Sequence, residues 1–132
     1  MIIAVDFDGT CVAHDFPRVG PNIGAGEVLR DLVAEGHQII LNTIRGDADG
    51  KVFLSEAVMW FIKNDIPLYG VNVNPEQHKH TNSPKVHADL FIDDRGLGCP
   101  LVNNKKISKY PFVDWLEVRK QLYRTGYITR DY

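Results

Sequence analysis

The sequence predicts an α/β protein with a three-layer, Rossmann-like parallel sheet that carries helices on both faces. Short apolar runs that fit buried strands alternate with segments whose apolar residues recur at helical spacing. The chain has 132 residues, which is the size of one domain, and no repeat or linker divides it. A hydrophobic fraction of 44% is typical of a chain that buries a core. We therefore expect a single domain over residues 1–132.

The first half of the chain contains two expected strands and two expected helices. Residues 2–5 and 38–42 are apolar runs of strand length, and polar residues follow both. Between them, apolar residues at helical spacing predict a helix that ends near Gly36. A second apolar stripe predicts an amphipathic helix over residues 52–64. Residues 11–24 contain two prolines and two glycines, which favours a loop or flap.

The second half continues the alternation. Residues 68–73 and 88–92 are expected to be strands, and a short strand is possible at 101–102. The polar residues 74–84 between the longer strands predict a mobile loop. Apolar residues between Phe112 and Tyr123 predict a C-terminal helix.

Charge and cysteine content exclude several classes of protein. The formal net charge is -2, so no general attraction to nucleic acid or anionic lipid is expected. The two cysteines, Cys11 and Cys99, lack metal-ligand spacing, and we expect reduced thiols. No apolar run approaches the ~20 residues of a membrane span, and no basic segment with a long apolar stretch opens the chain. These features predict a cytoplasmic protein with no membrane partner.

Polar side chains follow three of the expected strands. They are Asp6, Asp8, Thr43, Arg45, Asp93 and Asp94. Each alone could cap a helix or stabilise a turn. Together, at the carboxyl edge of one parallel sheet, they would lie where such folds bind ligands. Crowded carboxylates repel one another, and a hard divalent cation such as Mg²⁺ relieves that repulsion.

Four segments resemble the signatures of the haloacid-dehalogenase superfamily. Val5-Asp6-Phe7-Asp8-Gly9-Thr10 is similar to its first signature, an apolar strand followed by Asp-x-Asp-Gly-Thr. Residues 40–43 resemble the second, a strand that ends in Thr or Ser, and Lys85 resembles the lysine of the third. Residues 90–94 resemble the fourth, a strand that ends in paired acids. The resemblance implies a haloacid-dehalogenase-like fold, and the short connections predict no separate cap domain.

The resemblance further implies a Mg²⁺-dependent phosphatase that hydrolyses phosphate monoesters. Asp6 would attack phosphorus and become an aspartyl-phosphate, with Asp8 as general acid and base. Mg²⁺ would be held by the carboxylates of Asp6 and Asp94 and by the main-chain carbonyl of Asp8. Asp93 would be either a direct ligand or a group of the outer shell.

The same resemblance assigns the phosphate contacts. Thr43 and Lys85 would stabilise charge on the transferred phosphoryl group. Further candidate substrate-binding residues are Gly9, Thr10, Arg45 and Arg18. The short chain connections leave specificity to residues 11–24, to residues 74–84 or to a neighbouring subunit, so a homo-oligomer is one open arrangement.

Two other functions remain open from the sequence, and a third is disfavoured by the order of its motifs. A nucleotide or nucleic-acid-end phosphatase would use the same site, with a phosphorylated small molecule or nucleotide as its partner. A response-regulator receiver also combines acids, a threonine and a lysine, but its acidic pair follows the first strand, which is not the order found here. A catalytically weak phosphate-binding or regulatory protein could keep the site without turnover.

Overall fold

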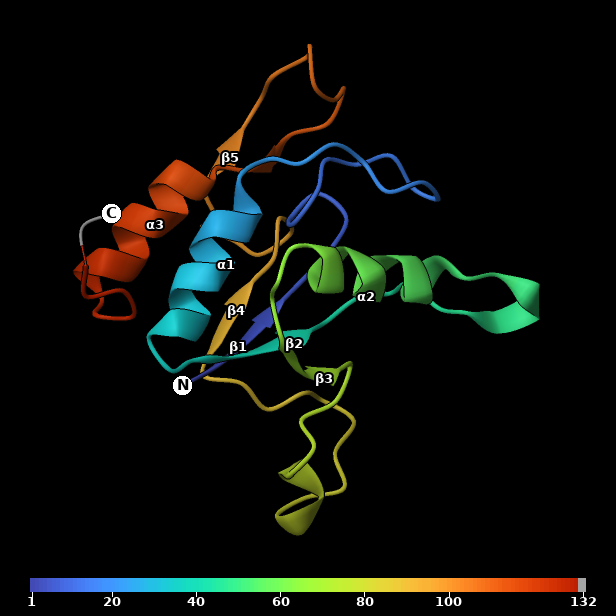
Figure 1. Ribbon diagram of the computed structural model, residues 1–132, viewed down its shortest axis with the longest axis vertical. Coiled ribbons are helices and arrows are strands. Elements are labelled where there is room, and N and C mark those ends of the chain that lie inside the picture. Colours follow the sequence, from blue (N-terminus) through green and yellow to red (C-terminus); the bar gives the residue numbers. More distant parts are fainter. Residues whose placement is uncertain (131–132) are drawn as a thin grey trace.

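A computed structural model of the chain describes residues 1–130, which form a parallel sheet, three α-helices and a small hairpin (Figure 1). The elements of regular structure are β1 (Ile2–Val5), α1 (Ala25–Ala34), β2 (Gln38–Leu41), α2 (Phe53–Lys63), β3 (Leu68–Val71), β4 (Leu90–Ile92), β5 (Leu101–Val102), β6 (Phe112–Val113) and α3 (Trp115–Arg124). Two short 3-10 turns, Ala48–Gly50 and Gln77–Lys79, lie in the connections. Within residues 1–130, no helix has the length and apolarity that crossing a membrane requires.

The main sheet has four parallel strands in the order β3-β2-β1-β4. This order matches the first four strands of the doubly wound Rossmann arrangement, so the predicted parallel α/β sheet is confirmed. β2 and β4 pair with opposite edges of β1. The order in which strands are added to the sheet therefore reverses between β1 and β4, which is called the reversal point below. Val5 lies beside Leu41 on one side and Ile92 on the other, so the residues that follow these three strands share one edge.

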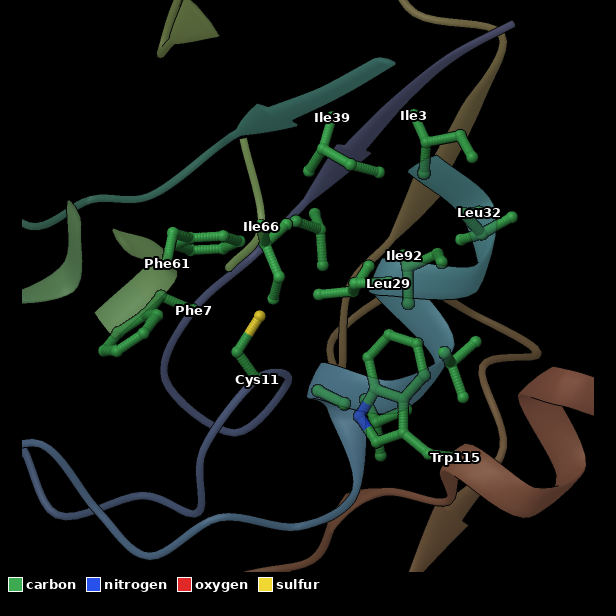
Figure 2. Close-up of a cluster of buried hydrophobic side chains, with 14 of the residues drawn as sticks. Ile3, Phe7, Cys11, Leu29, Leu32, Ile39, Phe61, Ile66, Ile92 and Trp115 are labelled. Atoms are coloured by element: carbon green, nitrogen blue, oxygen red, sulfur yellow. The ribbon is translucent and has the colours of Figure 1, made fainter. Parts of the chain in front are cut away.

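One face of the sheet carries the core. Ile3, Val5, Ile39 and Leu41 point to this face and belong to one buried cluster with residues of all three α-helices. Figure 2 shows this cluster, with the strand residues Ile3, Ile39 and Ile92 and one labelled residue from each α-helix: Leu29, Phe61 and Trp115. Burying one such side chain contributes about 1.5–3 kcal/mol, so this shared cluster holds α1, α2 and α3 on the same face.

The opposite face is covered by the β3–β4 connection, residues 72–89. Gly70 points to this face, and a Cβ there would overlap the carbonyl oxygen of Val73. Phe91 points the same way and borders a cavity lined by residues 77–88. Only the 3-10 turn Gln77–Lys79 interrupts this irregular segment. The prediction of helices on both faces is therefore wrong for the described residues.

Side-chain hydrogen bonds hold the β3–β4 connection, which was expected to be a mobile loop over residues 74–84. The buried Asn74 donates from Nδ2 to the carbonyl of His87 at 3.0 Å. Gln77 donates from Nε2 to the carbonyl of Lys85 at 2.6 Å, and its Oε1 accepts from the His87 amide at 2.7 Å. The side chains of Asn74 and Gln77 thus satisfy backbone groups of the connection that have no partner in a helix or strand.

The C-terminal segment differs from its prediction at one end. Phe112 lies in β6, which pairs antiparallel with the expected short strand β5, and the helix begins only at Trp115. Asp114 caps α3, because its Oδ1 accepts from the Glu117 amide at 3.3 Å. The amide of Val113 donates to the carbonyl of Gly9 at 3.0 Å, so the hairpin is attached directly to the loop that follows β1.

Candidate active site

Three carboxylates meet at the carboxyl edge of the sheet. Asp6 follows β1, and Asp93 and Asp94 follow β4, the strand that pairs with β1 across the reversal point. Their ligand oxygens all lie within 4.8 Å of one another. The Asp6 amide donates to the Ile92 carbonyl at 3.0 Å, which extends the ladder beyond the strands and fixes this spacing. The structure therefore brings together three of the acids that the sequence placed at this edge.

Burial and mutual contact shift the pKa values of two of these carboxyl groups. Burial, the hydrogen bond to Asp94 and the negative charge of Asp93 raise the pKa of Asp6 from 3.8 to about 7. Burial acts in the same direction on Asp94, but hydrogen bonds from His14 and Asp6 outweigh it and lower its pKa. The pKa values of Asp6 and Asp94 therefore shift in opposite directions. A divalent cation with oxygen ligands fits this donor set, since it would offset most of the negative charge of the three carboxylates.

Thr10 and His14 hold the carboxylates in place. The Thr10 hydroxyl lies 3.0 Å from Asp6 Oδ2 and 3.2 Å from Asp94 Oδ1, and it accepts from the Asp94 amide at 3.0 Å. His14 Nε2 lies 2.9 Å from Asp94 Oδ2. Thr10 is fully buried, so it bridges carboxylates and does not contact substrate as the sequence had suggested. The hydrogen bond from His14 fixes the orientation of the Asp94 carboxylate.

The packing around the acidic centre requires glycine at position 9. Its φ of +81° lies in the left-handed region, and a Cβ there would overlap the Nε2 atom of His14. The close approach at Gly9 is thus to the His14–Asp94 pair, within the protein itself. Its expected role as a contact for phosphate stays a prediction.

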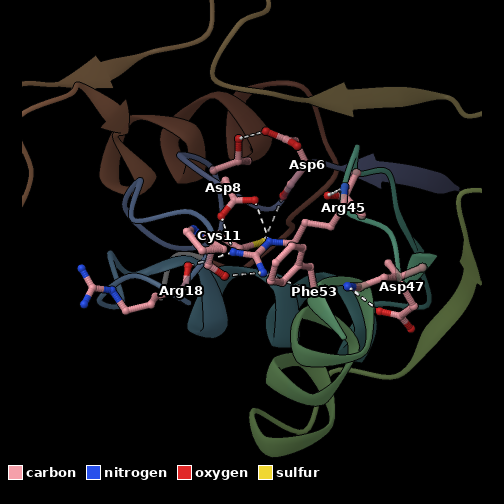
Figure 3. A network of polar contacts seen from close by, with 11 residues as sticks. Asp6, Asp8, Cys11, Arg18, Arg45, Asp47 and Phe53 are labelled. Carbon is pink, nitrogen blue, oxygen red and sulfur yellow. Dashed lines mark hydrogen bonds and ion pairs between the residues drawn. The ribbon is translucent and has the colours of Figure 1, made fainter. Parts of the chain in front are cut away.

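Arg45 binds Asp8 and closes the flap onto the sheet (Figure 3). Its Nε and Nη2 atoms each lie 2.8 Å from an oxygen of the Asp8 carboxylate. Its other N–H groups donate to the carbonyls of Pro17 at 3.2 Å, Arg18 at 2.8 Å and Phe53 at 3.2 Å. A guanidinium has five N–H donors, and five hydrogen bonds are made here. The prediction that Arg45 reaches the substrate is therefore wrong, because no donor remains.

The other two predicted basic residues also lie away from the acidic centre. The Arg18 side chain is 81% exposed and pairs with Asp15. Lys85 lies in the β3–β4 connection and lines the cavity beside Phe91, on the second face of the sheet. The irregular connection places Lys85 on the face of the sheet opposite the helices, before β4 begins. The prediction that Lys85 lies beside the transferred phosphate is therefore wrong.

A cavity of about 590 Å³ opens over the acidic centre. Its lining residues are Asp6, Asp8, His14, Phe16, Asn42, Thr43, Ile44, Asp93, Asp94 and Arg95. Thr43 is held by its own loop, since its amide donates to Asn72 Oδ1 at 2.7 Å and its hydroxyl oxygen accepts from the Arg45 amide at 3.1 Å. The hydroxyl proton of Thr43 is left for a ligand.

Sequence reasoning missed three residues around this centre. His14 and Arg95 line the cavity, and Trp115 donates from Nε1 to the Thr10 carbonyl at 2.7 Å. Arg95 directly follows the paired acids, which is a sequence signal for a cation at the site. Nothing in the local sequence indicates that the flap residue His14 or the helix residue Trp115 reaches the centre. Cys11 is buried, and burial raises the pKa of its thiol well above the usual value.

Comparison with known proteins places the chain beside one solved structure. A conserved protein from Bacteroides thetaiotaomicron is 36% identical in sequence, with a TM-score of 0.74 over 95% of this chain and 91% of the other. No family model matches the chain, and no curated protein matches it significantly. Identity at this level over nearly the whole length of both chains shows that the chain belongs to the same family as that conserved protein from Bacteroides thetaiotaomicron.

Proposed function

We propose that the chain is a Mg²⁺-dependent phosphatase of the haloacid-dehalogenase type that hydrolyses phosphate monoesters. The observation that carries this proposal is the acidic centre: Asp6, Asp93 and Asp94, with ligand oxygens within 4.8 Å, at the reversal point of a parallel sheet. Ligands in such sheets bind outside the carboxyl ends of the strands at this point. The open cavity of about 590 Å³ leaves room for a phosphate ester.

The three carboxylates have separate tasks in this proposal. Mg²⁺ would neutralise the charge that develops on the phosphoryl oxygens and keep Asp6 ionised. Asp93 and Asp94 would hold the ion together with one oxygen of Asp6, and His14 would orient Asp94. Asp6 would attack phosphorus in line, forming an aspartyl-phosphate while the bond to the leaving oxygen breaks.

Asp8 is the proposed acid and base. It would give a proton to the leaving alcohol and then take one from the water that attacks the aspartyl-phosphate, which releases phosphate and restores Asp6. The two 2.8 Å bonds from Arg45 fix the orientation of the Asp8 carboxylate at the wall of the cavity. Arg45 is thus a positioning residue, which acts through Asp8.

The positive charge beside the phosphoryl group is assigned to Arg95. With Lys85 on the second face of the sheet, His14 and Arg95 are the basic side chains that line this cavity among residues 1–130. His14 is already bound to Asp94. Arg95 and the Thr43 hydroxyl would therefore stabilise the transferred group.

The test is hydrolysis of 4-nitrophenyl phosphate with Mg²⁺ and with EDTA, in the wild type and in Asp6→Asn. Turnover should require Mg²⁺ and fall to the uncatalysed rate in Asp6→Asn. Asp49→Asn is a matched control, because Asp49 is exposed and outside the cavity, and it should keep wild-type turnover. Equal turnover in EDTA or in Asp6→Asn would contradict the proposal.

A second candidate is a catalytically weak phosphate-binding protein. The position of Lys85 outside the acidic cavity favours it, because the expected lysine does not reach the phosphoryl group. This function predicts no turnover of any ester but tight, Mg²⁺-dependent binding of beryllofluoride to Asp6.

A further inference from the structure

A second cavity, of about 660 Å³, adjoins the acidic one. The two share His14 and Phe16 in their walls. The outer wall of the second cavity comes from the loop between β5 and β6, residues 103–111, which lies with the flap beyond the carboxyl ends of the strands (Figure 1). A group bound at the acidic centre would therefore extend into the second cavity on this side.

The two cavities have opposite chemical character. The acidic cavity carries four aspartates, whereas Lys105 and Lys109 line the second cavity with one acid, Asp15. Two aromatic rings also line this cavity, and both are open to solvent: Phe16 is 55% exposed and Tyr110 is 50% exposed. Large exposed rings next to paired cations are suited to stacking a planar group that carries negative charge.

A chain of contacts connects the basic loop to the acidic centre. Lys105 Nζ donates to the Lys109 carbonyl at 2.6 Å, which closes the loop. Lys109 Nζ lies 5.2 Å from the centre of the Tyr110 ring, and that ring packs edge-on against His14 at 5.7 Å between centroids. His14 in turn lies 2.9 Å from Asp94. The rings and lysines are thus placed relative to the carboxylates by the fold.

We propose that the second cavity is the leaving-group subsite and that it binds a nucleotide bearing a second phosphate group. This inference rests on the proposed phosphatase, since the first phosphate would lie at the acidic centre. The base would stack on Tyr110 or Phe16, and the second phosphate would bind between Lys105 and Lys109. A neutral, non-aromatic leaving group would make no use of the exposed ring surface or of the positive charge in this cavity.

Binding to Asp6→Asn tests the subsite without depending on turnover. Calorimetry in Mg²⁺ would compare adenosine 3′,5′-bisphosphate with adenosine 5′-monophosphate, and we expect the bisphosphate to bind about tenfold more tightly or better. Adding Lys105→Ala and Lys109→Ala should remove that advantage. Lys106→Ala is the matched control, because Lys106 is exposed in the same loop but outside the cavity, and it should keep the advantage.

A second variant covers the risk that the double substitution disorders the loop. Lys109→Glu reverses a charge but leaves the Lys109 carbonyl that Lys105 binds, and it should lower bisphosphate affinity about tenfold or more. A 5′-phosphorylated dinucleotide in the same assay shows whether the second phosphate belongs to a free nucleotide or to an oligonucleotide end. Whichever of the two ligands binds more tightly identifies that source.

The failure of the subsite and the failure of the phosphatase are distinguishable. Equal affinity for the two adenosine nucleotides, or an advantage that survives Lys109→Glu, would overturn the subsite whatever the enzyme hydrolyses. A wild type without turnover on any ester, combined with selective bisphosphate binding, would overturn the phosphatase and leave the subsite standing.

Discussion

Replacing Arg45 by methionine should lower the melting temperature (Tm) of the protein substantially. The Arg45 side chain is fully buried, and the Asp8 carboxylate that it binds is only 14% exposed. Methionine fills similar space but leaves that carboxylate and three backbone carbonyls without their donor. Breaking a buried ion pair by removing one partner typically costs about 3–5 kcal/mol. An unfolding entropy of about 2.1 cal/mol/K per residue converts this into a fall in Tm of about 10–20 °C.

The assay is thermal and urea denaturation followed by circular dichroism, in EDTA and again in Mg²⁺. Arg18→Met is the matched control, since that side chain is 81% exposed and its pairing with Asp15 should contribute less than about 1 kcal/mol. Adding Asp8→Asn to Arg45→Met should recover part of the lost stability, because the buried charge is then removed. An Arg45→Met protein within about 1 kcal/mol of the wild type would refute the reasoning.

Three further predictions concern the acidic centre. Gly9→Ala should weaken Mg²⁺ binding, measured by calorimetry, because the new Cβ displaces His14; wild-type affinity would contradict the packing argument. In EDTA, the pKa of Asp6 is about 7 in the native protein and near 3.8 in the unfolded chain. The native protein therefore binds this proton more tightly, which stabilises the fold at low pH, and that stabilisation is lost as the pH rises toward 7. Asp6→Asn should therefore gain stability relative to wild type between pH 5 and 8, by up to about 3 kcal/mol in urea denaturation, and a constant difference would exclude the raised pKa. Trp115→Phe removes the donor to the Thr10 carbonyl and should cost about 1–3 kcal/mol in the same assay, where an unchanged midpoint would show that the bond contributes nothing.

The strands and the acids that follow them could be predicted from local pattern. A parallel strand buried within a sheet must be apolar throughout, so residues 2–5 and 38–42 were recognisable and the observed β1 and β2 match them closely. Once the strands are parallel, their carboxyl ends share an edge. The meeting of Asp6 with Asp93 and Asp94 follows from this rule without knowledge of any side-chain contact.

The basic residues could not be placed in this way. A long cationic side chain goes wherever the fold offers carbonyls and carboxylates, and the partners of Arg45 come from the flap, from α2 and from Asp8, 37 residues away. Lys85 depended on the path of an irregular connection that has no periodicity to read. The pairing of His14 with Asp94 spans 80 residues. Apolar periodicity is a local property that burial imposes on each element, whereas these contacts exist only after distant segments have packed together, and for that reason only the tertiary structure could reveal them.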